Sequence, residues 1–67
     1  MDKNNGSAVF PSGRALHAME RLGGSFVKAL ADVYCAADPQ NKQRLAAAFP
    51  DYFERYEHVA LQMNIEA

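Results

Sequence analysis

The sequence contains few of the residues that cross-link small proteins or form catalytic sites. It contains a single cysteine, Cys35, no tryptophan, and two histidines. One cysteine excludes an internal disulfide and favours a reducing compartment. No apolar run approaches the roughly 20 residues of a membrane span, and the polar residues 1–7 are not followed by the apolar core of a secretion signal. We therefore expect a soluble, cytoplasmic protein that does not enter a membrane.

The chain also has no excess of either charge. Eight acidic and seven basic residues give a formal net charge of −1. This argues against bulk phosphate binding, because dedicated nucleic-acid binders usually carry a basic excess. The charges are mildly segregated, with five bases and three acids in residues 12–44 and four acids and one base in residues 51–67. Such asymmetry is typical of surfaces that steer association, and it also arises by chance in a short chain.

The size of the chain limits its stability. Its 67 residues are 49% hydrophobic, which is typical of one globular domain. A single core of this size rarely supplies more than about 3–5 kcal/mol. The sequence suggests neither a metal site nor a disulfide, so the remaining sources of stability are very good packing and self-association. We expect a homodimer.

Apolar spacing and helix-boundary residues predict an all-α fold, a small bundle of three to four short helices. The predicted helices span about 13–22, 25–37, 39–49 and 51–63; residues 1–8 form a flexible tail and residues 9–67 a single helical domain. No segment shows the strict alternation of a half-buried strand.

The expected boundaries follow from capping chemistry. Ser12, Ser25 and Asp38 are predicted N-caps, because their side-chain oxygens accept hydrogen bonds from free backbone N–H groups. Gly23 and Gly24 are predicted to end the first helix, because glycine tolerates the left-handed conformation common there. Prolines at positions 39 and 50 favour new helix starts.

The apolar residues predict which helix faces point inward. The predicted inner residues are Ala15, Met19 and Leu22; Phe26, Val27, Leu30, Val33, Tyr34 and Ala37; Leu45, Ala48 and Phe49; and Tyr52, Tyr56, Val59, Ala60 and Met63, with Phe53 at the margin. Leu61 and Ile65 do not fit this pattern, and the small residues Ala29 and Ala36 flank it. These four residues are the predicted protein-interface positions.

No constellation of residues points to catalysis, a metal or a cofactor. His17 and His58 lie on different predicted helices, whereas a zinc site needs three or four convergent ligands. Cys35 has no activating base within helical reach. The carboxylates at positions 51, 54 and 57 are interpreted as a solvated face, because acid/base catalysis needs a sheltered pocket. We expect a protein that is not an enzyme.

Two features leave nucleic-acid binding open as the less favoured alternative. Gly23 and Gly24 precede a helix, as in phosphate-binding turns, but the full phosphate-loop pattern is absent and a tight helix–helix turn explains them better. A helix-turn-helix would need a basic reading helix, and the second predicted helix is not basic. The candidate anion or nucleic-acid residues are Arg14, His17, Arg21 and Lys28.

Two motifs carry a resemblance to known sequences. They are Gly-Gly-Ser-Phe at residues 23–26 and Ala-Phe-Pro-Asp-Tyr-Phe-Glu-Arg-Tyr at residues 48–56. Over residues 22–56 the pattern resembles a group of short hypothetical proteins from phages, prophages and proteobacterial genomes. The resemblance implies a mobile-element context and transfers no activity or site residue. Small phage accessory proteins, anti-CRISPR proteins among them, often act by binding and blocking.

These observations favour an interaction module over an enzyme. We expect a non-enzymatic helical protein that binds, and thereby blocks or recruits, another macromolecule, with an unidentified protein as its partner. The alternative is a small nucleic-acid-binding transcriptional regulator.

Overall fold

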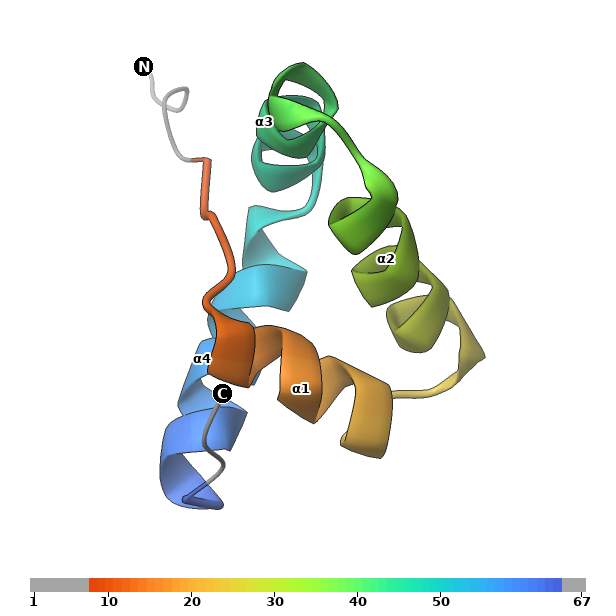
Figure 1. Ribbon diagram of the computed structural model, residues 1–67. Helices are drawn as coiled ribbons and strands as arrows, with labels where there is room; N and C mark the ends of the chain where they lie inside the picture. Colours follow the sequence, from red (N-terminus) through yellow and green to blue (C-terminus); the bar gives the residue numbers. More distant parts are fainter. Residues whose placement is uncertain (1–7, 65–67) are drawn as a thin grey trace.

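The computed structural model describes residues 8–64 and confirms the all-α prediction (Figure 1). Four helices follow one another as α1 (Gly13–Leu22), α2 (Ser25–Ala36), α3 (Pro39–Ala48) and α4 (Pro50–Gln62). Each predicted bound agrees with the structure to within one residue. The predicted flexible tail lies outside the described residues except for Ala8. Within residues 8–64, no helix combines the length and hydropathy needed to cross a membrane.

Two of the three predicted caps are present. The Ser12 Oγ accepts a hydrogen bond from the Ala15 N–H at 3.2 Å, and an Asp38 carboxylate oxygen accepts one from the Asn41 N–H at 2.8 Å. The prediction for Ser25 is wrong, because Ser25 is already the first residue of α2 and Gly24 occupies the cap position without a side-chain hydrogen bond. The Gly24 carbonyl accepts from the Lys28 N–H at 2.9 Å, which is consistent with Gly24 as the cap of α2.

The turn between α1 and α2 needs a glycine for a reason that the sequence did not suggest. Gly23 has φ −78° and ψ 158°, an extended conformation, so the predicted left-handed ending is wrong. A Cβ at this position would lie 2.6 Å from the Met19 carbonyl oxygen and 2.7 Å from the Val27 Cβ. Gly23 is therefore required by the close approach of the start of α2 to the end of α1.

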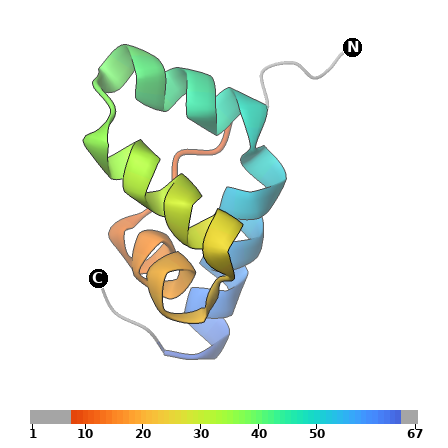
Figure 2. The ribbon, with the colours of Figure 1, turned by 90° about the vertical axis from the view of Figure 1, so that its right-hand side faces the viewer.

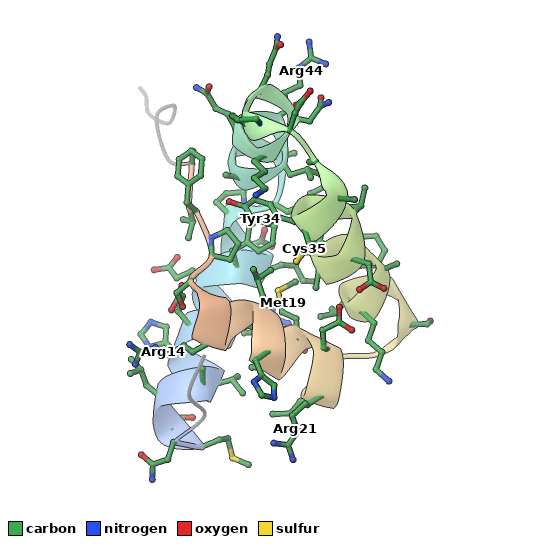
Figure 3. The ribbon with its side chains drawn as sticks, in the orientation of Figure 1. Arg14, Met19, Arg21, Tyr34, Cys35 and Arg44 are labelled. Carbon is green, nitrogen blue, oxygen red and sulfur yellow. The ribbon has the colours of Figure 1, made fainter. Side chains whose placement is uncertain are left out.

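The hydrophobic core lies where α1, α2 and α4 meet. Met19 and Phe53 are its largest fully buried side chains. The rings of Tyr34 and Phe53 pack edge to face with centroids 5.4 Å apart. Figure 3 shows Met19 and Tyr34 pointing into the space between the helices. The Lys42 Nζ lies over the Tyr34 ring, 5.4 Å from its centroid, and links α3 to the same core.

The buried face of α4 differs from the predicted one. Phe53, expected at the margin, is completely buried, whereas Met63, expected inside, is exposed. The reason is tertiary: α1 packs across α4 more extensively than any other pair of helices pack together, and this contact turns the Phe53 side of α4 inward. Ala15 and Ala18 of α1 and Ala60 of α4 are fully buried, and such small side chains let helix axes approach closely.

A carboxylate of α4 completes the cap of α1. The Ser12 N–H donates to Glu57 Oε2 at 2.7 Å, and the Ser12 hydroxyl donates to Glu57 Oε1 at 2.9 Å. The interpretation of Glu57 as part of a solvated acidic face is therefore wrong. Its side chain is partly buried and joins two elements 45 residues apart in sequence.

We expect the Ser12→Ala and Glu57→Ala variants each to lower the free energy of unfolding by about 1 kcal/mol. Because the two residues form one network, the double variant should lose clearly less than the sum of the single losses. Urea denaturation followed by circular dichroism would measure this coupling. Glu54→Ala is the control, since Glu54 is exposed; strictly additive losses would contradict the predicted network.

Candidate protein-interaction groove

An open groove of about 390 Å³ lies between α2 and α3. The two helices meet at the turn around residues 37–38 and diverge toward the start of α4 (Figure 2). The groove is lined by Val33, Ala36, Ala37, Asn41, Arg44, Leu45 and Ala48. Five of these seven side chains are apolar, and none is an acid, a histidine or a cysteine. The groove can therefore hold an apolar surface, and it offers no nucleophile or general base.

One face of α2 extends this groove along the molecule. Phe26, Ala29, Val33 and Ala36 recur every three or four residues and are all exposed. At about 100° per residue they lie on one side of the helix. Phe26 and Val33 were predicted to face inward, which is wrong. The core uses the neighbouring side of α2, with Val27, Leu30, Ala31 and Tyr34, and the described residues supply no helix to cover the rest.

An aromatic cluster lies at the N-terminal end of this face of α2. The ring centroid of Phe26 lies 6.0 Å from that of Phe49 and 5.4 Å from that of Tyr52. The Arg55 guanidinium carbon lies 5.8 Å from the centroid of the Tyr52 ring. We call the continuous surface the apolar track, formed by Phe26, Ala29, Val33, Ala36, Leu45, Ala48, Phe49 and Tyr52.

The four predicted interface residues fall in different places. Ala36 lines the groove and Ala29 lies on the exposed face that extends it. Leu61 is exposed but lies near the other end of α4 from Tyr52. Ile65 lies outside the described residues. The structure thus brings two of the four predicted positions together on the apolar track.

Sequence reasoning did not identify the large exposed side chains of the track, or the arginine that lines its groove. Large apolar side chains such as Phe26 and Val33 are usually assigned to the core, so no local signal marked them as exposed. Arg44 lines the groove, and its side chain extends away from the helices (Figure 3). The packing of α3 beside α2 places this side chain on the wall of a groove that residues of both helices line.

The predicted anion-binding residues are spread over α1 and α2. Arg14, His17 and Arg21 are exposed on α1, where Arg14 and Arg21 point in different directions away from the core (Figure 3). Lys28 is exposed on α2 beside an acidic pair. Interaction with the Asp32 carboxylate, chiefly a shared hydrogen bond, raises the pKa of Glu20, and the charge of Lys28 opposes this rise. Lys28 therefore faces two carboxylates, which reduces its attraction for a phosphate.

The repulsion between Glu20 and Asp32 predicts a pH effect. A carboxyl group whose pKa is raised by folding binds its proton more tightly in the folded state, so its contribution to stability falls as pH rises through its titration. Glu20→Gln should therefore raise the melting temperature at pH 7 and leave it unchanged at pH 3. Thermal unfolding at both values would measure this, with Glu54→Gln as the exposed control. An unchanged melting temperature at pH 7 would show that the repulsion has no effect on stability.

The part of the chain that the structure describes has few other groups that could bind a metal or react. Within residues 8–64, no three His, Cys, Asp or Glu side chains gather as a metal-binding group. Cys35 is an exposed free thiol. Comparison of the chain with protein-family models, with curated proteins and with solved structures found no match.

Proposed function

We propose that this chain is a non-enzymatic helical interaction module that docks onto another protein through the apolar track. The observation that carries the proposal is the groove of about 390 Å³ between α2 and α3, continuous with an exposed apolar face of α2. Contiguous exposed apolar surface is costly in water and marks interaction sites in soluble proteins. Bound to a partner, the module would block or recruit it.

The cellular setting belongs to the same proposal. The single cysteine favours a reducing cytoplasm. The sequence resemblance to phage and prophage proteins favours an accessory protein of a mobile element, for which binding and blocking is a common mode of action. Neither point alters how the apolar track would bind.

Nucleic-acid binding is the less supported alternative. The net charge is −1, and Lys28 lies beside Glu20 and Asp32. Arg14 and Arg21 point in different directions on α1, so they do not form a compact basic surface (Figure 3). A phosphate-binding surface would need several cations to act together.

Self-association remains a separate prediction that rests on the small size of the core. Leu61 is its candidate contact, because it is a large apolar side chain exposed away from the apolar track. Light scattering coupled to size-exclusion chromatography would give the oligomeric state of the wild type and of Leu61→Asp.

Paired substitutions test the docking proposal directly. Val33 and Leu61 are exposed to similar extents, 50% and 57%, so Asp at either position should leave the core intact. We expect Val33→Asp to lower recovery of the partner in a tagged pulldown from source lysate by at least tenfold, because it places a charge in the apolar groove. Leu61→Asp should retain the partner. Circular dichroism of both variants would check that they fold.

The same pulldown distinguishes the alternatives. Recovery that survives nuclease and is lost only with Val33→Asp supports docking through the apolar track. Recovery lost with Leu61→Asp instead would move the contact to the end of α4. Recovery that collapses with nuclease and is insensitive to Val33→Asp would favour the nucleic-acid alternative.

A further inference from the structure

One buried carbonyl group of α3 has no hydrogen-bond donor within its own helix. In an α-helix each carbonyl accepts from the N–H of the residue four positions later. The residue four positions after Ala46 is Pro50, which has no N–H. Ala46 is fully buried, so water does not replace the missing donor. A buried carbonyl without a hydrogen bond is destabilising, and the fold must supply a donor from another part of the chain.

The donor comes from the segment that precedes α1. The Val9 N–H donates to the Ala46 carbonyl oxygen at 3.1 Å. Val9 is also partly buried and packs against the hydrophobic core. Figures 1 and 2 show this segment running from the end of α3 to the start of α1. A backbone hydrogen bond and an apolar contact therefore hold the segment against the end of α3.

The same segment is anchored a second time, at its other end. The Ser12 N–H and hydroxyl donate to the Glu57 carboxylate of α4 at 2.7 Å and 2.9 Å. Phe10 lies between the two anchors and is exposed. We call residues 8–12 the strap. The strap connects α3 to α4 by contacts that are independent of the direct packing between these helices.

α3 depends on the strap because it is weakly held by the other helices. Of its ten residues, all of which the structure describes, Ala46 alone is buried, whereas α1 buries three residues and α2 buries four. Its other contacts with the core come from Lys42 and Leu45, whose side chains are partly exposed. α3 also packs against α2 and α4 much less extensively than α1 packs against α4. Segments with few buried apolar contacts open locally while the rest of a fold persists.

We propose that the strap holds α3 in its docked position, and that release of Val9 from Ala46 lets α3 leave the core as a unit while α1, α2 and α4 remain folded. Four of the residues that line the groove belong to α3, so the groove exists only while α3 is docked. The strap therefore controls whether the groove is formed. This inference concerns the fold itself and does not depend on what the groove binds.

Amide hydrogen exchange of the full chain tests the proposal without any substitution. Exchange would be followed residue by residue by NMR, under native conditions and at increasing low concentrations of urea. The Val9 amide lies outside every helix, yet we expect it to be protected. It should exchange with the same free energy and the same urea dependence as the amides of residues 43–49. Amides at the centres of α1 and α4 should show stronger protection and a steeper urea dependence, because only global unfolding exposes them.

Substitutions in the strap separate its hydrogen bond from its packing. Val9→Pro removes the N–H that bonds to Ala46 and keeps an apolar side chain, so the amides of residues 43–49 should exchange about tenfold faster. Ala8→Pro is the matched control and should leave this exchange unchanged, because the Ala8 N–H donates no backbone hydrogen bond among the described residues. Val9→Ala keeps the N–H and removes most of the packing. It should also accelerate exchange in α3, so it tests the strap independently of whether the Val9→Pro variant folds.

The results that contradict the proposal are distinct. An unprotected Val9 amide in the wild type would overturn the role of the strap, as would equal exchange of residues 43–49 in Val9→Pro and Ala8→Pro. If these residues had the same urea dependence as α1 and α4, α3 would unfold only with the whole chain, and its separate opening would be wrong. None of these measurements uses a partner, so failure of the docking proposal would leave this inference standing.

Discussion

Phe53→Ala is expected to leave most of the chain unfolded at 25 °C. The Phe53 side chain is completely buried and packs against Tyr34 with ring centroids 5.4 Å apart. Removing a buried phenylalanine costs about 3–5 kcal/mol, from lost burial and the remaining cavity. A core in a chain this short supplies about the same amount. The measurement is the free energy of unfolding by urea, followed by circular dichroism.

Two further variants separate burial from residue type. Phe10→Ala removes the same side chain at an exposed position and should change stability by less than about 0.5 kcal/mol. Phe53→Leu keeps the site apolar with less lost volume and should leave a folded, weakened protein. A folded Phe53→Ala variant with nearly wild-type stability would show that Phe53 does not anchor the core.

Gly23→Ala is expected to lower stability by about 2–3 kcal/mol, near the upper end of typical overpacking costs. Its Cβ would lie 2.6 Å from the Met19 carbonyl oxygen and 2.7 Å from the Val27 Cβ. Neither atom can move without shifting a helix. The strain should appear as a melting temperature lowered by roughly 8 °C or more for a domain of this size.

The neighbouring glycine provides the control for this prediction. A Cβ on Gly24 would meet nothing within 4 Å, and its φ of −75° suits any residue. Alanine there restricts the unfolded chain, which is favourable, and is a poorer N-cap than glycine, which is unfavourable. The two effects should cancel to within about 0.5 kcal/mol. Equal losses for both variants would show that glycine flexibility, and not close packing, is what the turn requires.

The core and the apolar track share one helix. Val27, Leu30 and Tyr34 occupy one side of α2 and are buried, while Phe26 and Val33 occupy the adjacent side and are exposed. Helical periodicity alone merges them into a single apolar stripe of about 120°. The division arises because α1 and α4 cover only part of that stripe.

Part of the candidate interface could be predicted, because helical periodicity locates the apolar stripe of α2 and the small residues beside it. Ala29 and Ala36 stood out as small residues beside the stripe, and the structure places both on the apolar track. Arg44 and Arg55 gave no signal, because a lone arginine on a short helix is ordinary. Their relation to the track depends on contacts of Arg55 with Tyr52 and on the groove that α3 forms with α2.

Local chemistry determined the helices of this protein, and tertiary packing decided which faces they bury. Caps at Ser12 and Asp38, the glycine turn and the prolines act within a few residues, so the four helices could be predicted to within one residue. The burial of Phe53, the partnership of Glu57 with Ser12 and the exposure of Val33 depend on how helices cross. Those crossings join residues far apart in sequence. The spacing of apolar residues along one helix therefore does not show which side of that helix its neighbours will cover.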